Sequence, residues 1–139
     1  MNAATLAIAL SLLSGAPNME VQGHRGARSV LPENTIPGFL HALDAGAHVL
    51  EMDTVVTADD QVVVLHDPVL NPQLCAPVGG GDLKGEVVVR AITLEALRGY
   101  HCTRLLKRFP KQTAISPLPI PTLAEVLAAV AQHPRGEEV

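Results

Sequence analysis

Aromatic residues are scarce in this chain of 139 residues, which has two phenylalanines, one tyrosine and no tryptophan. Aliphatic side chains must therefore supply the core. The net charge is −4 and the pI is near 5.8, and there is no basic stripe. Without basic patches or aromatic surfaces on which bases could stack, we expect no nucleic-acid partner. No internal repeat is present, and the length suits one modest domain.

The sequence also lacks an apolar run long enough to cross a bilayer as a helix, which takes roughly 20 residues. The uncharged apolar run over residues 3–13 is typical of the core of a secretory signal peptide, and Ser14-Gly15-Ala16 offers a cleavage site. We predict a signal peptide over residues 1–16, a periplasmic or secreted protein, and no stable membrane span. The alternative is an N-terminal extension on a cytoplasmic protein, since residues 1–2 carry no positive side chain.

No C-x-x-C pair is present, which argues against zinc or thioredoxin-type chemistry. Cys75 and Cys102 are the only cysteines. We expect two unpaired thiols, with a loop disulfide as the alternative in an exported protein.

Apolar patterning predicts an α/β fold. The expected elements are a strand over 21–24, a helix from an Asn34 N-cap to about Ala45, a doubly buried strand within 47–56 and another over 62–65. Such near-continuous aliphatic strands with a crossover helix indicate a mainly parallel sheet. A capping box at Thr122 predicts a helix to about Gln132. Between them, residues 70–119 are rich in proline and glycine, with one helical piece over 93–98.

Glu51 and Asp53 are the most informative polar pair. Residues two apart in a strand point to the same face, so both carboxylates project together from an aliphatic run. A divalent cation removes their repulsion, and hard oxygen ligands suit Mg²⁺ or Ca²⁺. The alternative is a solvated sheet edge.

His24 and His66 each follow an apolar strand, at the edge where α/β folds build active sites. Such a pair can act as general acid and general base, and Arg25 can hold a phosphate oxygen. Taken singly, each histidine would more often be structural, and it is their matching placement at two strand ends that favours catalysis. Glu33 could cap a turn or reach the site.

In order and spacing, His24-Arg25-Gly26-Ala27, Pro32-Glu33-Asn34-Thr35, Glu51-x-Asp53 and His66-Asp67 resemble the glycerophosphodiester phosphodiesterases. The resemblance resumes at Ile120-Pro121-Thr122-Leu123, and residues 70–119 resemble the insertion of the exported members. It implies a TIM-type (β/α)8 barrel, of which residues 17–139 would be the N-terminal part.

The resemblance also implies hydrolysis of a small-molecule glycerophosphodiester to an alcohol and glycerol 3-phosphate. By position, His24 and His66 would be the catalytic acid–base pair, Arg25 would bind phosphate, and Glu51 and Asp53 would bind the metal. A complete barrel takes about 250 residues, so we expect a truncated chain that is inactive by itself. The alternatives are a phospholipase D-like enzyme acting on sphingomyelin or lysophospholipids, and a non-catalytic phosphate- or cation-binding module. No pattern predicts the oligomeric state.

Overall fold

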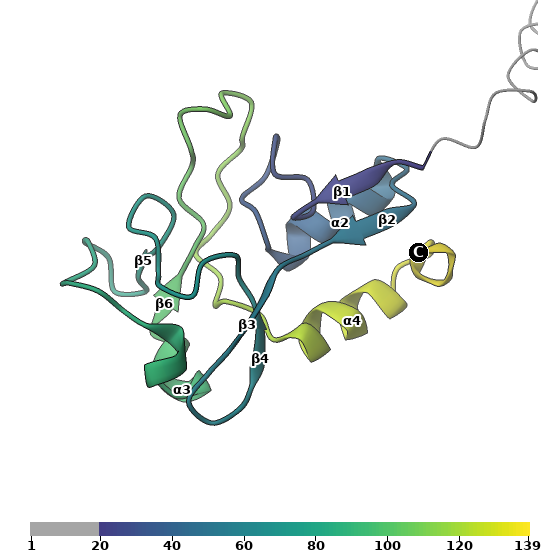
Figure 1. Ribbon diagram of the computed structural model, residues 1–139. Coiled ribbons are helices and arrows are strands. Elements are labelled where there is room, and N and C mark those ends of the chain that lie inside the picture. Colours follow the sequence, from purple (N-terminus) through teal and green to yellow (C-terminus); the bar gives the residue numbers. More distant parts are fainter. Residues whose placement is uncertain (1–19) are drawn as a thin grey trace, which may run out of the picture.

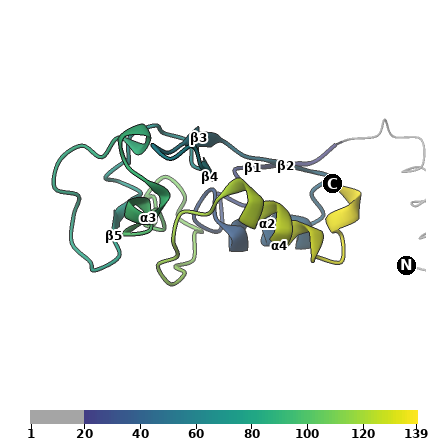
Figure 2. The ribbon, with the colours of Figure 1, turned by 90° about the horizontal axis from the view of Figure 1, so that it is seen from below.

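The computed structural model describes residues 20–139, and the predicted signal peptide lies outside them. In the first part of the molecule, residues 20–69 and 120–139, strands β1 to β4 lie in one layer, and helices α2 and α4 lie together on one side of it (Figures 1 and 2). The elements of this part are β1 (Gln22–His24), α2 (Ile36–Asp44), β2 (Val49–Glu51), β3 (Thr54–Val56), β4 (Val62–Val64), α4 (Leu123–Ala131) and the 3₁₀ turn η2 (Gly136–Glu138). Among residues 20–139, no helix has the length and apolarity that crossing a membrane requires.

Strands β1 and β2 are parallel, and α2 makes the predicted crossover between them. Their register places His24 opposite Glu51. Gly23 lets α2 approach β1 closely, because a Cβ at this position would lie 2.9 Å from the Cβ of Ala42. The predicted βαβ connection is therefore confirmed.

The single strand predicted within 47–56 is wrong. The chain leaves β1 after Glu51, and the carbonyl of Asp53 instead accepts a hydrogen bond from the amide of Leu65 at 3.0 Å. β3 then pairs with β4 in the antiparallel direction as a separate two-stranded sheet, so the predicted mainly parallel sheet is wrong for this part of the chain. Nor is this stretch buried on both faces, since Val56 and its partner Val62 are each 39% exposed. At these two residues the ribbon of β3 and β4 is covered on one face only. Because the ribbon consists mostly of consecutive valines, its sequence does not show which side chains lie on the covered face.

Helix α2 has the predicted apolar face, and Phe39 and Leu43 are fully buried. The predicted N-cap, Asn34, is wrong by one residue. Thr35 caps the helix, because its Oγ1 accepts a hydrogen bond from the amide of Gly38 at 3.2 Å. Asn34 instead has a left-handed backbone, with φ of 55°. Its side-chain amide donates a hydrogen bond to Asp53, which follows β2.

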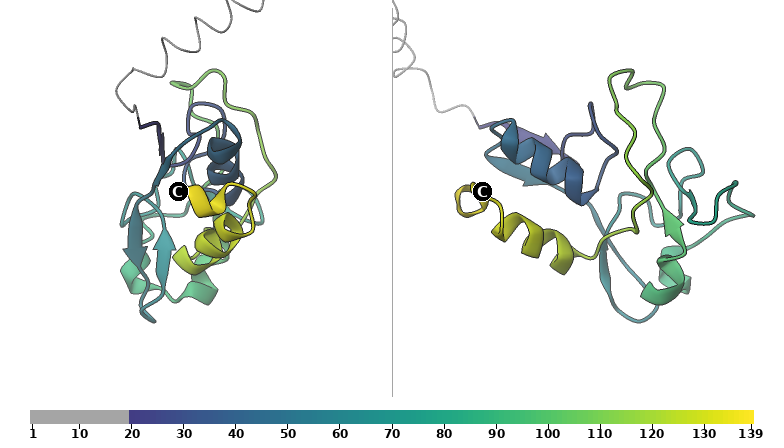
Figure 3. Two further views of the ribbon diagram at one scale, coloured as in Figure 1. Left: turned by 90° about the vertical axis from the view of Figure 1, so that its right-hand side faces the viewer. Right: turned by 180° about the vertical axis from the view of Figure 1, so that it is seen from behind.

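The capping box of α4 is confirmed, with Thr122 and Glu125 bonding each other's backbone amides. α4 packs beside α2 (Figure 3). One apolar cluster joins the two helices to β4, and it consists of Phe39, Leu43, Val64, Val126 and Val130. We call β1, α2, β2 and α4 the βα region.

Residues 70–119 form the second part, called here the insertion. It contains β5 (Ala76–Pro77), the 3₁₀ turn η1 (Val89–Ala91), α3 (Leu94–Leu97) and β6 (Tyr100–His101). The expectation of two unpaired thiols is wrong, since Cys75 and Cys102 form a disulfide across the β5–β6 pair. The two cysteines are 27 positions apart in the sequence. Only the antiparallel register of β5 and β6, which pairs Ala76 with His101, brings them together, so local sequence patterns could not predict the disulfide.

The insertion has its own apolar cluster, which includes Leu70, Leu97 and the two cysteines and also takes in Val63 of β4. The next residue, Val64, belongs to the cluster of the βα region. Since successive side chains of a strand point to opposite faces, β4 is the seam between the two parts.

Candidate active site

The loop after β1 begins the site. Gly26 has φ of 79°, and a Cβ there would lie 2.8 Å from the backbone of Gly38, so only glycine allows this turn. Arg25 is also left-handed, with φ of 53°. The turn aims the backbone amide of Arg25 at Glu51, whose Oε2 accepts its hydrogen bond at 2.9 Å. The Nε2 atom of His24 lies 3.8 Å from the same oxygen.

A cluster of five charged or polar side chains lies behind this turn. Glu33 is 4% exposed and bridges two arginines, Arg25 at 2.8 Å and Arg28 at 2.9 Å. Arg25 also places its Nε 3.2 Å from Oδ2 of Asp53, and the side-chain amide of Asn34 donates to that oxygen at 3.3 Å. Charge is therefore balanced locally, as buried ions require.

Burial lowers the pKa of the Arg28 guanidinium from its ordinary value. The negative charge of Glu33 acts in the opposite direction, and the positive charges of Arg25 and Arg108 add to the lowering. Arg28 also lies near the imidazole of His24, with 3.5 Å between Nη1 and Nδ1. One cation of the insertion, Arg108, therefore lies close enough to Arg28 to act on the edge of the site.

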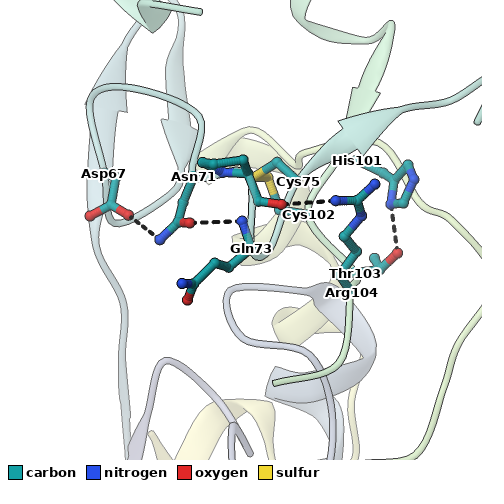
Figure 4. The surroundings of a disulfide bond; sticks show 9 residues. Asp67, Asn71, Gln73, Cys75, His101, Cys102, Thr103 and Arg104 are labelled. Carbon is teal, nitrogen blue, oxygen red and sulfur yellow. Dashed lines mark hydrogen bonds between the residues drawn. A yellow bond between two sulfur atoms is a disulfide. The ribbon is translucent and has the colours of Figure 1, made fainter. Parts of the chain in front are cut away.

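His66 follows β4 and has its own orienting partners. Its Nδ1 lies 2.6 Å from Oδ1 of Asp67, and Asn71 donates to the other carboxylate oxygen at 3.3 Å. Asn71 in turn accepts from the amide of Gln73 at 2.9 Å (Figure 4). A proton on Nδ1 that is shared with a carboxylate leaves Nε2 as the free nitrogen of the ring.

Four of the five predicted site residues are linked by direct contacts of Arg25 and Glu51, and they are His24, Arg25, Glu51 and Asp53. The fifth, His66, forms no hydrogen bond or ion pair with them among residues 20–139. It instead lines a small pocket together with Glu33 and Asn34, the partners of Arg25 and Asp53.

The sequence motifs did not indicate a role for Arg28, and they left undecided whether Glu33 caps a turn or reaches the site. Both lie within the stretch of recognised motifs, and Glu33 is the residue that connects the two arginines. The available signal was a pair of arginines three apart around Gly26, followed by a single carboxylate in an otherwise uncharged turn.

A divalent cation fits the donor chemistry of Glu51 and Asp53 but needs further ligands. Each carboxylate has one oxygen engaged by the cluster, and both side chains are partly exposed. In the described part of the chain, no group of three or more acidic, histidine or cysteine side chains could hold a metal. Glu51 and Asp53 are the described residues that would contribute hard oxygen ligands to a divalent cation.

A model of the glycerophosphoryl diester phosphodiesterase family matches residues 24–137. The chain belongs to this family. A glycerophosphodiester phosphodiesterase from Bacillus altitudinis is 34% identical over 114 residues, which are 82% of this chain and 41% of that protein. A human lysophospholipase D is 43% identical over 61 residues, which are 44% of this chain and 19% of that protein.

Solved structures of family members have the same fold. A structure from Silicibacter pomeroyi, assigned as a glycerophosphoryl diester phosphodiesterase, superposes with a TM-score of 0.78 at 36% identity and covers 85% of this chain and 42% of that one. An Oleispira antarctica phosphodiesterase, 22% identical, gives a TM-score of 0.62 over 83% of this chain and 41% of its own, and was solved with the product sn-glycerol-3-phosphate. The predicted α/β fold of the TIM-barrel type is confirmed, and the chain spans about two fifths of the length of these relatives.

Proposed function

We propose that the protein hydrolyses glycerophosphodiesters, releasing an alcohol and glycerol 3-phosphate. The observation that carries this proposal is the cluster in which the ends of β1 and β2 bring His24, Arg25 and Glu51 together. A phosphodiester needs a cationic group for its oxygens and a proton donor for the leaving alkoxide, and this cluster holds both types of side chain.

Two histidines would share the proton transfers. When water adds to phosphorus and the bond to the alcohol oxygen breaks, one proton leaves the water and one joins the alkoxide. Asp67 holds the ring of His66 through Nδ1, which leaves Nε2 to exchange a proton with a reacting group. His24 lies beside Glu51, with 3.8 Å between its Nε2 and the Oε2 of the carboxylate.

Arg25 would hold the phosphate, and its neighbours would position it. Its Nη1 and Nε atoms are engaged by Glu33 and Asp53, so Nη2 is the nitrogen left to donate to a phosphate oxygen. Glu51 and Asp53 would bind Mg²⁺ or Ca²⁺, which supplies charge stabilisation at the phosphoryl oxygens when bound.

The test is release of glycerol 3-phosphate from a panel of glycerophosphodiesters by the protein in its full natural length. His24→Ala and His66→Ala should each lower kcat by about 10²- to 10⁴-fold. His41→Ala, on the exposed side of α2, is the matched control and should retain activity. Equal activity in all three variants would exclude the proposed acid–base pair.

The metal ligands have a test of their own. Titration calorimetry with Mg²⁺ or Ca²⁺ should show weaker binding in Glu51→Gln and Asp53→Asn than in Glu95→Gln, which alters an exposed carboxylate of the insertion. Unchanged metal affinity in the first two variants would remove the metal role from both residues.

A second candidate is a phospholipase D-like activity on lysophospholipids. It is favoured by the 43% identity to the human lysophospholipase D over 61 residues. Comparing lysophosphatidylcholine with glycerophosphocholine as substrates separates the two activities. Binding of Mg²⁺ or Ca²⁺ without turnover of either would favour the non-catalytic module.

We further propose that the protein is exported, with the cytoplasm as the alternative. The disulfide between Cys75 and Cys102 supports this proposal, because disulfides persist in oxidising compartments and are rare in the cytosol. Cell fractionation combined with thiol labelling tests it, and reduced cysteines in a cytoplasmic fraction would contradict it.

A further inference from the structure

An open pocket of about 550 Å³ lies beside the candidate site, between two segments of the insertion. Asn71, Gln73 and Leu74 form one wall, and the other comes from residues 105–108. Asn71 and Leu74 also line the smaller pocket that holds His66. The two pockets are therefore neighbours that share Asn71 and Leu74 in their walls.

The walls of this pocket are fixed relative to each other. The amide of Arg104 donates to the carbonyl of Leu74 at 3.1 Å, and its guanidinium donates to the carbonyl of Pro72 at 2.8 Å. The disulfide joins the residues just beyond these contacts, Cys75 and Cys102. Such cross-links favour a pocket that is formed before a ligand binds.

The pocket is cationic although the chain as a whole is acidic. Lys107 and Arg108 line it, and both are exposed. Among residues 20–139 neither forms an ion pair, and no acidic residue occurs between Glu95 and Glu125 in the sequence. Arg104, by contrast, is neutralised by Asp82 at 2.7 Å. The positive charge at the pocket is thus uncompensated.

This charge connects with the site behind it. Arg28 and Arg108 each lie 5.0 Å from the centre of the Phe109 ring, so the same aromatic side chain packs against an arginine of the site and one of the pocket. Among the described residues, the pocket is lined by no carboxylate and by no aromatic ring, the two features that attract quaternary ammonium groups.

We propose that this pocket receives the alcohol part of the diester, and that Lys107 and Arg108 select alcohols without positive charge, such as glycerol or inositol, over choline. The inference rests on the proposed hydrolysis of glycerophosphodiesters. Hydroxyl groups can accept hydrogen bonds from the two cations and from the side-chain amide of Gln73, whereas a trimethylammonium group can accept none and is repelled.

The experiment compares glycerophosphoglycerol with glycerophosphocholine, which share the glycerol phosphate and differ in the alcohol. In the full-length protein with Mg²⁺ or Ca²⁺ present, we expect kcat/KM to be about tenfold higher for glycerophosphoglycerol, a factor typical of two partly exposed charges. The double variant Lys107→Ser with Arg108→Ser should reduce this preference to about twofold or less. Lys84→Ser with Lys111→Ser, which removes two charges that do not line the pocket, should leave it unchanged.

The outcomes separate this inference from the proposed function. Hydrolysis of both substrates with no preference, or with a preference that survives Lys107→Ser with Arg108→Ser, would overturn the pocket assignment and leave the activity standing. If neither substrate is hydrolysed, the proposed function fails, and calorimetric binding of the same two compounds decides the pocket. Tighter binding of glycerophosphoglycerol that the double variant abolishes would support it, and equal or absent binding would overturn it.

Discussion

The βα region and the insertion are stabilised by different means. In the βα region, α2 and α4 bury a shared apolar cluster against the strands, and regular hydrogen bonds satisfy the backbone. In the insertion, regular elements are two to four residues long, and side chains such as Arg104 and Gln112 hold the backbone carbonyls of distant segments. Packing of two regular helices supports the βα region, whereas the insertion combines its own apolar cluster with cross-links between irregular loops.

This difference matters for the site, which draws on both regions. His24, Arg25 and Glu51 come from the βα region, whereas Asn71, which orients Asp67, belongs to the insertion. The cluster on β1 and β2 therefore depends on helix packing, and the environment of His66 depends on the cross-linked loops. The following experiments test whether the two regions can be weakened separately.

The largest effect is expected in the βα region. Phe39→Ala removes a fully buried ring from the cluster between α2 and α4, which should cost about 3–5 kcal/mol of unfolding free energy. Leu127→Ala alters a side chain of α4 that is 54% exposed and should cost less than about 0.5 kcal/mol. Urea unfolding measures both, and a similar cost for the two would contradict the proposed apolar support.

The insertion should respond most strongly to loss of its disulfide. Cys75→Ser with Cys102→Ser opens a 27-residue loop and should cost about 3.5 kcal/mol by the chain-entropy relation. Hydrogen exchange should accelerate at Val78 and Arg104, whose amides bond within the insertion, more than in α2. Equal acceleration in α2 would mean that the two regions unfold as one unit.

A smaller contrast is expected at the helix caps. Thr122→Ala removes half of the capping box of α4 and should cost about 1 kcal/mol. Thr93→Ala removes the cap of α3, a helix of four residues that its surroundings rather than its own hydrogen bonds keep in place, and should cost less. Thermal unfolding of both variants measures the two costs. A larger cost for Thr93→Ala would mean that α3 depends on its own cap more than α4 does, against the proposed difference between the two regions.

The sequence predicted the βα region better than the insertion for a physical reason. Spacing of Phe39 and Leu43 and the capping box at Thr122 are local signals, and both helices follow them. The break after Glu51 was missed because valine runs fit one strand or two equally well. In the insertion, the link between Cys75 and Cys102 arises only from long-range register, which local patterns do not encode.

The candidate site shows the same limit. The sequence motifs predicted His24, Arg25, Glu51 and Asp53 as site residues. The parallel register of β1 and β2 brings the first three together. Arg28 and the bridging position of Glu33 depend on the path of the loop between them, including the left-handed turn at Arg25. Backbone geometry of this kind is set by contacts with α2, so spacing in the sequence could not reveal it.

The smallest effect is expected at the ion pair that joins the two regions, between Arg98 and Glu125 at 2.7 Å. Partial burial raises the pKa of the Glu125 carboxyl, but hydrogen bonds from Thr122 and Arg98 outweigh that effect and hold the pKa below its ordinary value. Because the folded pKa is depressed, the stabilisation is present above about pH 4.5 and is lost as the pH falls through the folded pKa.

Glu125→Gln should therefore cost less than about 1 kcal/mol at pH 7, since the pair is partly exposed, and the cost should shrink toward pH 3. Unfolding free energies of the variant and the parent at pH 7, 5, 4 and 3 measure this convergence. Glu95→Gln, which alters an exposed carboxylate of α3 that forms no ion pair among residues 20–139, is the control and should cost less than Glu125→Gln at pH 7. A cost that stays constant down to pH 3 would mean that Glu125 acts only through its neutral hydrogen bonds in the capping box, and that the ion pair does not couple the two regions.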